Sequence, residues 1–459
     1  MQLVAYGAQD VYLTGNPKVT FFQAVYKRHT NFAMELIQQT TNGSPAPNGR
    51  VSVTIARNGD LVGNMHIALT PTAVALTSNN TGGYDTNWIA ERAISAIELT
   101  IGGQRIDKHY QTWWRLYAEL FLNESDKYAW GKMTTLANLN TGTTSLNTRV
   151  FLPLLFFFNR NPGLYLPLIA LQYHEVRLDI DLSNYYDKYF GTTNAFEVWA
   201  NYIYLDTEER RRFAQKGHEY LIEQVQHTGG DSLDATKGEG AQQLVRLSFN
   251  HPVKELIWCY TNSAASATAQ LNALWNFSTS TSNVNVSCNT QSFVISNNWI
   301  LPHLTGVPSL VATAGQSSTL FGSLVTFQAG TGSCYWVEEG SAVANSTTMA
   351  GVEVGPLNLF KVILNGQDRF KEQNGKYFNQ VQPFYHHTGT PYPGIYTYSF
   401  ALQPEEHQPT GTCNFSRIDN AQVSVQLKTN SAASLQKLFA VNYNVLRIQS
   451  GMGGLAFSN

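Results

Sequence analysis

Two aspartates in an alternating segment have a spacing that could support chemistry. Asp179 and Asp181 stand two residues apart, so on a strand their carboxylates would share one face and could bind a cation or divide acid and base roles. They alternate with Leu178, Ile180 and Leu182, a period of two that is typical of a strand with one buried face. We therefore expect an ordinary solvent-facing or interface surface here.

Histidines offer the next chemical candidates. Three pairs could contribute an imidazole to a metal: His386-His387, His174-Glu175 and His218-Glu219. Metal ligands must converge, and none of these pairs has the spacing of a zinc-enzyme motif. The sequence also lacks a Gly-x-Ser-x-Gly elbow, a phosphate-binding loop and a dinucleotide fingerprint. We predict that the chain is not an enzyme and uses neither a metal nor a cofactor.

The cysteines point to the same conclusion. They are widely spaced and form no Cys-x-x-Cys pair: Cys259, Cys288, Cys334 and Cys413. This spacing indicates neither a zinc site nor a disulfide framework. We expect reduced thiols with structural roles.

Asparagines are the candidate sites of modification. Asn-x-Ser/Thr tripeptides begin at Asn42, Asn79, Asn123, Asn276, Asn285, Asn345 and Asn414. The tripeptide alone is weak evidence, and the amino terminus has no secretory signal that would bring the chain to the usual machinery. If sugars are attached, we expect them at Asn276, Asn285 and Asn345. No window approaches the run of about 18 apolar residues that a membrane span needs, so we expect synthesis in the cytosol.

The sequence predicts that strands position these residues. Charged residues make up 14% of the chain, and strand-like stretches are separated by many Gly, Asn, Ser and Thr residues. The clearest stretches are 51–55, 66–69, 96–101, 151–158, 176–182, 196–203, 220–225, 244–249, 255–260 and 421–427. Several alternate apolar with polar residues, which favours an all-β fold of β-sandwich type.

A short helix is predicted between Asp206 and Gln215, with helix-forming residues at 207–213, and it separates two strand-rich halves. Glu208 and Glu209 stand beside Arg210, Arg211 and Arg212 there, and such mixed charge is typical of a solvated face. We place a domain boundary near residue 217. The formal net charge is −2, so the chain has no excess of positive charge for binding phosphates. We therefore expect no direct contact with nucleic acid.

An internal repeat suggests that one unit occurs twice. The stretch ELTIGGQRI at 98–106 resembles KVILNGQDRF at 361–370, and each reads as a strand that enters a tight turn with Gly before Gln. Gly permits the positive φ that such hairpins need. A further alternating strand follows each copy, at 176–182 and at 421–427. Two copies of one sandwich account for both observations.

Two segments differ from this pattern. Residues 1–30 have too little apolar content for a core of their own, and we expect an arm that lies along a larger body. Residues 262–355 are rich in Ser, Thr, Asn, Ala and Gly, with no Lys or Arg between Lys254 and Lys361. Their aromatic residues, such as Trp275 and Phe277, argue against disorder. We expect long loops of the second half that form a folded, uncharged projection.

Six blocks of sequence carry a resemblance to a known family. They are YGAQDVYLTGNP at 6–17, YKRHTNF at 26–32, IGGQRIDKHY at 101–110, PLIALQYHEV at 167–176, GTCNFSRIDN at 411–420 and NYNVLRI at 442–448. Together they span nearly the whole chain. The sequence resembles the major capsid proteins of nucleocytoplasmic large DNA viruses, in particular those of phycodnaviruses and chloroviruses.

The resemblance implies a fold and a role. The fold would be a double jelly roll, two eight-stranded antiparallel β-sandwiches in tandem at 31–216 and 217–459, with the long loop insertions in the second. Three chains would form a pseudo-hexagonal capsomer that tiles an icosahedral shell above an internal viral membrane. The implied partners are itself as a homotrimer, neighbouring capsomers and minor capsid proteins beneath the shell. The arm would lie at the capsomer base, and the loops would face outward.

The sequence departs from the chlorovirus pattern in residues 262–355 and in a shortened stretch at 429–437. Family members carry sugars in these regions, often outside the ordinary tripeptide, which makes Asn430 an equal candidate beside Asn276. Two alternatives to the bulk shell protein stay open. One is a minor capsid or vertex paralogue of the same fold. The other is a carbohydrate-binding or carbohydrate-cleaving β-sandwich. Cleavage would need two carboxylates in a groove, and the loop offers only Glu338, Glu339 and Glu353.

Overall fold

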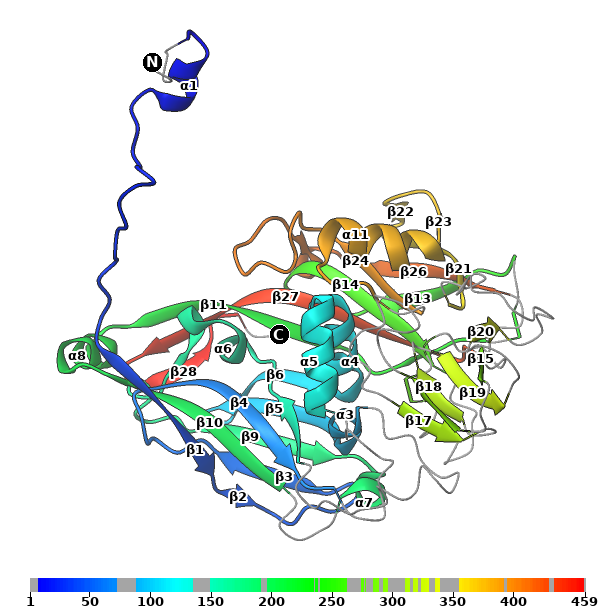
Figure 1. Ribbon diagram of the computed structural model, residues 1–459, viewed down its shortest axis with the longest axis horizontal. Coiled ribbons are helices and arrows are strands. Elements are labelled where there is room, and N and C mark those ends of the chain that lie inside the picture. Colours follow the sequence, from blue (N-terminus) through cyan, green and yellow to red (C-terminus); the bar gives the residue numbers. More distant parts are fainter. Residues whose placement is uncertain are drawn as a thin grey trace.

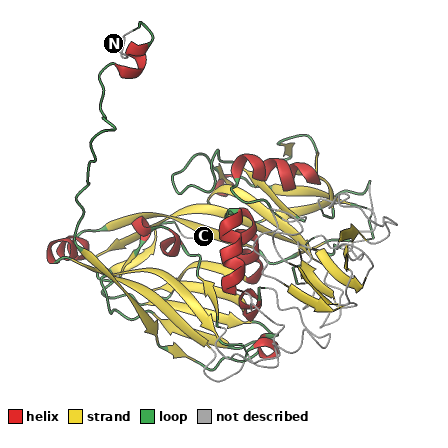
Figure 2. Ribbon diagram, viewed as in Figure 1, coloured by secondary structure: helices red, strands yellow, loops and turns green. Residues whose placement is uncertain are grey.

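The chain folds into two halves that have the same strand order (Figures 1 and 2). The computed structural model describes residues 7–71, 88–134, 149–190, 196–234, 236–237, 240–261, 274–275, 277, 355–391, 394–428 and 433–457, with the backbone of six strands between 284 and 338.

In the first half, eight strands form two antiparallel sheets. One sheet has the order β1 (Phe32–Gln39), β10 (Phe196–Leu205), β4 (Leu61–Leu69) and β7 (Val150–Pro153). The other has the order β3 (Arg50–Thr54), β9 (Val176–Leu182), β5 (Ile94–Ile101) and β6 (Gln104–Tyr110). The two-residue strands β2 (Thr41–Asn42) and β8 (Leu166–Pro167) extend these sheets.

The second half repeats this arrangement. One sheet has the order β11 (His218–His227), β27 (Leu435–Gln449), β14 (Pro252–Thr261) and β24 (Ile395–Ser399). The other has the order β13 (Gln243–Leu247), β26 (Ala421–Leu427), β21 (Leu357–Leu364) and β22 (Gln367–Asp368). Four short strands pair with inner strands of these sheets: β12 (Asp231–Ser232) and β28 (Met452–Leu455) with β27, β25 (Cys413–Asn414) with β14, and β23 (Gln373–Asn374) with β21.

The two strand orders are identical once each half is numbered along the chain. In both halves, strands one, eight, three and six form one sheet, and strands two, seven, four and five form the other. This is the order of an eight-stranded jelly roll. The chain is a double jelly roll, as the sequence predicts.

The repeated hairpin occupies the same place in both halves. β5 and β6 turn through Gly102 and Gly103, whose φ angles are +57° and +83°. β21 and β22 turn through Asn365 and Gly366, whose φ angles are +52° and +76°. Each hairpin lies at the edge of its sheet, next to β9 in the first half and β26 in the second. The prediction of one hairpin in each half is confirmed.

Helices interrupt each jelly roll between its fifth and sixth strands. The first half inserts α4 (Gln111–Leu120) and α5 (Glu124–Thr134) between β6 and β7. The second half inserts η3 (Tyr377–Val381) and α11 (Gln382–His386) between β22 and β24. Figure 1 shows α4 and α5 standing between the two halves, whereas α11 lies on the far side of the second half. The sequence analysis did not predict these helices.

Smaller helices complete the described part of the chain. They are α1 (Asp10–Thr14), α3 (Ile89–Ala93), α6 (Phe157–Arg160), η1 (Pro162–Leu164), α7 (Tyr186–Tyr189), α8 (Thr207–Gln215) and η4 (Phe415–Arg417). The helix predicted between Asp206 and Gln215 is therefore confirmed. The strand predicted at 151–158 is wrong in its second part, because β7 ends at Pro153 and α6 begins at Phe157. Proline lacks the N–H that would continue a ladder.

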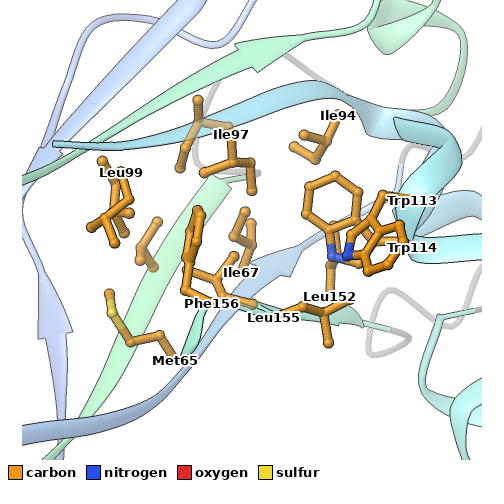
Figure 3. Close-up of a cluster of buried hydrophobic side chains, with 14 of the residues drawn as sticks. Met65, Ile67, Ile94, Ile97, Leu99, Trp113, Trp114, Leu152, Leu155 and Phe156 are labelled. Carbon is orange, nitrogen blue, oxygen red and sulfur yellow. The ribbon is translucent and has the colours of Figure 1, made fainter. Parts of the chain in front are cut away.

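Two apolar clusters form the core. The second cluster fills the inside of the second sandwich and includes Trp258 and Phe360, whose rings stack 4.3 Å apart. The first cluster fills the first sandwich around Ile67, Ile97 and Leu99 (Figure 3). It continues through Trp113 and Trp114 of α4 onto the outer face of the second half. The residues that extend it there are Ile257, Cys259, Ile395, Phe439 and Val441.

The loop-rich segment contains strands of its own. β15 (Val284–Cys288), β18 (Ser317–Leu320), β19 (Ser323–Ala329) and β20 (Tyr335–Glu338) form one sheet, and β16 (Ser292–Ile295) pairs with β17 (Leu310–Thr313). At the start of the segment, Trp275 and Phe277 are each 1% exposed and belong to the first apolar cluster. These two aromatics therefore anchor the segment to the body and do not project.

Candidate functional site

The junction between the halves is built from aromatic and aliphatic side chains. Trp113 of α4 lies 5.8 Å from the ring of Phe439 on β27, and the ring of Tyr110 lies 4.9 Å from that of His227 on β11. The Nζ atom of Lys437 donates to the Thr112 hydroxyl at 3.3 Å. The insertion helix of the first half thus covers the outer face of a sheet of the second half.

Buried charges reinforce the junction. Arg160 from α6 binds the Glu223 carboxylate of β11 at 2.9 Å, and Lys254 of β14 binds the same carboxylate at 2.7 Å. Burial alone would raise the pKa of Glu223, but His407 and the two cations outweigh it and lower the pKa to about 2. Glu223 is therefore charged at neutral pH, and its ion pair with Arg160 links the halves.

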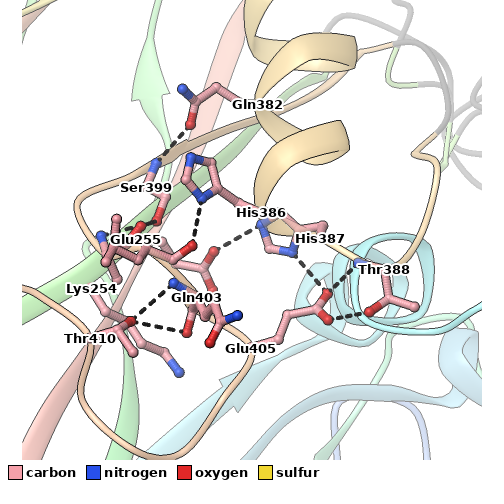
Figure 4. A network of polar contacts seen from close by, with 12 residues as sticks. Lys254, Glu255, Gln382, His386, His387, Thr388, Ser399, Gln403, Glu405 and Thr410 are labelled. Carbon is pink, nitrogen blue, oxygen red and sulfur yellow. Dashed lines mark hydrogen bonds and ion pairs between the residues drawn. The ribbon is translucent and has the colours of Figure 1, made fainter. Parts of the chain in front are cut away.

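A second group of charges centres on His387, just after α11 (Figure 4). Its imidazole is fully buried, with Nε2 3.0 Å from the Glu255 carboxylate and Nδ1 3.2 Å from that of Glu405. Burial opposes the charged imidazole, but the two carboxylates prevail and raise the pKa of His387 to about 9. The ring of Phe121, after α4, lies 5.2 Å away. The three charged residues all belong to the second half, and Phe121 brings the first half into contact with the imidazole.

The sequence analysis missed these charges at the junction. Lys254 and Glu255 are consecutive charged residues inside the apolar strand β14, and they are 1% and 0% exposed. Charged residues are rarely fully buried unless they are paired. Such a pair in an apolar run is the signal that could have identified them.

The other predicted chemical candidates have structural partners. Asp181 pairs with Arg50 at 2.6 Å, and Asp179 accepts from the Ser52 hydroxyl at 2.7 Å. In the structure, both aspartates thus have side-chain partners on the neighbouring strand β3. Among the described residues, no group of three or more His, Cys, Asp or Glu could hold a metal ion.

The remaining histidines of the predicted pairs each lie against a main-chain oxygen. His174 Nδ1 is 2.9 Å from the carbonyl oxygen of Gly453, and His218 Nε2 is 2.8 Å from that of Phe213. His386 Nδ1 is 3.1 Å from the carbonyl oxygen of Leu402. Each imidazole therefore fastens a loop or strand, and the structure does not bring the three together.

The structure describes the side chains of two cysteines, and both are free thiols. Cys259 is buried at the junction, and burial raises the pKa of its thiol to about 12. Cys413 is partly buried, which also raises its pKa. Thiolates are the reactive form, so both side chains are unreactive near neutral pH.

The amino-terminal arm is the most exposed part of the described chain. Residues 7–30 are all exposed, and the arm extends away from the body beyond β1 (Figure 1). It carries large apolar side chains, among them Tyr12 at 92% exposure and Phe22 at 98%. Exposed apolar side chains gathered in this way are uncommon on monomeric soluble proteins.

The glycosylation candidates can be placed only in part. Asn285 lies on β15, whose backbone alone is described. Asn276, Asn345 and Asn430 lie outside the described residues. Within the described chain, no helix has the length and apolar content to cross a lipid bilayer.

Comparison with known proteins identifies relatives of the whole chain. The family model "Major capsid protein N-terminus" matches residues 20–209, and "Large eukaryotic DNA virus major capsid protein" matches residues 209–454. The major capsid protein of Paramecium bursaria Chlorella virus 1 is 42% identical over 100% of this chain and 99% of its own length. That of Phaeocystis pouchetii virus is 39% identical over the same shares.

Solved structures agree with the sequence comparison. A chain in the quasi-atomic model of the PBCV-1 virus capsid is 38% identical and superposes with a TM-score of 0.70, covering 96% of this chain and 100% of that one. The Faustovirus major capsid protein, at 15% identity and a TM-score of 0.64, covers 97% and 94% and shares the fold. These findings confirm the resemblance found in the sequence. The chain belongs to the major capsid protein family of large eukaryotic DNA viruses.

Proposed function

We propose that this chain is a major capsid protein that forms homotrimers, each a pseudo-hexagonal capsomer of an icosahedral shell. The observation that carries the proposal is the repeated strand order, because two equivalent units in each chain give six in a trimer. A trimer with six similar units around its axis has a nearly hexagonal outline, and such particles can pack in a hexagonal lattice. The proposed role is structural, with no catalysis.

The units of assembly follow from the fold. We assign residues 31–216 to one jelly roll and 217–459 to the other, with α8 as the connection between β10 and β11. Residues 1–30 form the arm, whose exposed aromatic residues suit contact with neighbouring capsomers or with minor capsid proteins beneath the shell. The proposed location is the virion shell above an internal membrane, after synthesis in the host cytoplasm.

Sugars are proposed on asparagines within residues 262–355 and 429–437. Asn276, Asn285, Asn345 and Asn430 are the candidates. Mass spectrometry of peptides from purified virions tests them directly. A complete set of unmodified peptides covering these four positions would remove this part of the proposal.

The oligomeric state tests the main proposal. Analytical ultracentrifugation of the natively purified chain at micromolar concentration is expected to give a species of three times the 51.0 kDa chain mass. Electron microscopy is expected to show particles with threefold symmetry and a hexagonal outline. A stable monomer would contradict the proposal. Copy number per virion separates the bulk shell protein from a minor paralogue.

A further inference from the structure

A groove lies on the second half, beside the last described residues of the chain. It is bounded by β11, the start of β14, β27 and η4. Its volume is about 460 Å³, and small-molecule sites commonly have roughly 300–1,000 Å³. None of the charged residues of the junction lines it, so the groove is separate from the site described above.

The floor of the groove is apolar. Leu221 of β11 and Val445 of β27 pair in register there, and the rings of Tyr443 and Phe457 extend this lining. On the other side of β27, the Ala456 N–H donates to the Val445 carbonyl oxygen at 2.8 Å. The backbone at Val445 is thus bonded on both sides. A ligand can contact side chains here but cannot extend the sheet as an added strand.

One end of the groove carries hydrogen-bond donors from a single turn. Asn414 Oδ1 accepts from the Ser416 N–H at 3.0 Å, and Ser416 Oγ accepts from the His251 N–H at 2.8 Å. Both oxygen atoms are therefore engaged within the protein. The Asn414 amide nitrogen and the Ser416 hydroxyl hydrogen are left to donate outward, since neither has an acceptor among the described residues.

The next residue of the same turn supplies a positive charge. Arg417 is exposed and lines the groove, and its guanidinium forms no ion pair or hydrogen bond with the described residues. Among the described residues that line the groove, none is acidic. A guanidinium keeps its charge at any physiological pH, and its planar set of donors matches a carboxylate. This end of the groove therefore favours an anionic group.

The backbone holds these donors in position. His251 has a φ of +65°, which is uncommon for a residue other than glycine. Besides its bond to Ser416, its carbonyl oxygen accepts from the Phe415 N–H at 3.1 Å. Strained residues persist where the surrounding bonds fix them, and they are frequent at ligand sites. The turn is thus fastened to the start of β14 before any ligand binds.

We propose that this groove binds a single-chain amphiphile with a carboxylate head, of the kind represented by a medium-chain fatty acid. The carboxylate accepts from Arg417 and the neighbouring donors of the turn, and the hydrocarbon chain lies on Leu221, Val445 and Phe457. Both parts of the ligand are needed. An anion without a chain leaves the apolar floor in water, and a chain without a charge leaves the guanidinium unpaired. This inference goes beyond the proposed shell role and does not depend on it.

The first test compares ligands on the full chain. Decanoate is the probe, at concentrations below those that form micelles. The control 1-decanol has the same chain length without the charge, and acetate has the charge without the chain. Calorimetric titration is expected to show saturable binding of decanoate at one site per chain. Either control should bind about 10-fold more weakly, or weaker still.

The second test compares variants. R417Q is expected to raise the dissociation constant for decanoate on the order of 10-fold and to leave that for 1-decanol unchanged, because it removes only the charge. F457A should weaken both ligands about fivefold. The matched controls are R211Q on α8 and L244A on β13, which remove an exposed cation and an exposed apolar side chain outside the groove. Both controls should bind decanoate as the wild type does.

The outcomes separate this inference from the proposed function. If 1-decanol binds the wild-type chain as tightly as decanoate, or if R417Q binds decanoate as tightly as the wild type, the inference is wrong. An equal loss in R211Q would indicate general attraction of anions to the surface and would also overturn it. These results leave the trimer untouched. A monomeric chain that binds decanoate in this way would contradict the proposed function alone.

Discussion

At the level of single residues, His387 gives the pH dependence that we expect on the alkaline side. Its imidazole lies between two carboxylates in a site without solvent. Removing one partner of such a buried group leaves the other uncompensated, which costs more than the pair contributes when intact. The protonation state of this ring therefore influences the stability of the second half, in which all three charged residues lie.

The pH dependence of stability follows from the sign of this shift. The folded-state pKa of His387, about 9, lies above its usual value of 6.5. Its contribution to the free energy of unfolding is therefore fully present below pH 6.5 and is lost as the pH rises through 9. We predict a fall in the thermal unfolding temperature between pH 6.5 and 9.5, measured by calorimetry.

The variant H387Q provides the comparison. It should be less stable at pH 6 and should show a flatter profile on the alkaline side. Glu223 and Glu405 affect stability on the acidic side, because their pKa values are lowered in the folded chain. Their contribution to the free energy of unfolding is present above pH 4.5 and is lost as the pH falls. Equal alkaline slopes for H387Q and the wild type would refute the assignment to His387.

Alanine substitutions at two neighbouring glycines should reduce stability by different amounts. Both Gly102 and Gly103 have positive φ, so alanine at either position should cost about 1–2 kcal/mol of unfolding free energy. A Cβ at Gly102 would also overlap the ring of His174, whereas a Cβ at Gly103 would meet nothing within 4 Å. We predict that G102A destabilises the chain clearly more than G103A in urea unfolding. The reverse order would show that the hairpin contact with His174 is loose.

At the level of elements, the arm should affect assembly and leave the fold unchanged. Because residues 7–30 bury no side chain in the chain itself, deletion of residues 1–30 should leave the thermal unfolding temperature of the monomeric body within about 1 °C. Incorporation into shells should fall sharply. A large loss of monomer stability would mean that the arm folds back onto the body.

Strands were predictable because their period of two is local information. The stretches at 176–182, 196–203 and 421–427 correspond to β9, β10 and β26. The helix α6 could not be predicted in this way. Phe156, Phe157 and Phe158 are all buried, and a continuous apolar run shows neither the helical nor the strand period. The burial of α4 depends on a sheet far along the chain, which no local pattern reveals.

At the level of the whole molecule, the candidate site depended on contacts that the sequence does not show. The pairing of two jelly rolls could be inferred from the hairpin repeat. The ion cluster of Glu255, His387 and Glu405 joins three distant segments, so only the fold brings them together.

The shared apolar cluster predicts cooperative unfolding of both halves. Because the first cluster includes Ile257, Phe439 and Val441 of the second half, separation of the halves would expose them. We expect a single calorimetric transition for the full chain. Residues 217–459 expressed alone should bind a hydrophobic dye and aggregate. A soluble fragment with a sharp transition of its own would contradict this prediction.

The order in which strands are made has a consequence for protein synthesis. β27 lies between β11 and β14 in the middle of its sheet, and β28 behind it contacts the first half through Gln104 and His174. A ribosome that stops before residue 435 releases a polypeptide without this central strand. Such shortened products lack the strand that pairs with both β11 and β14, so we expect them to fail to fold and to be absent from assembled shells.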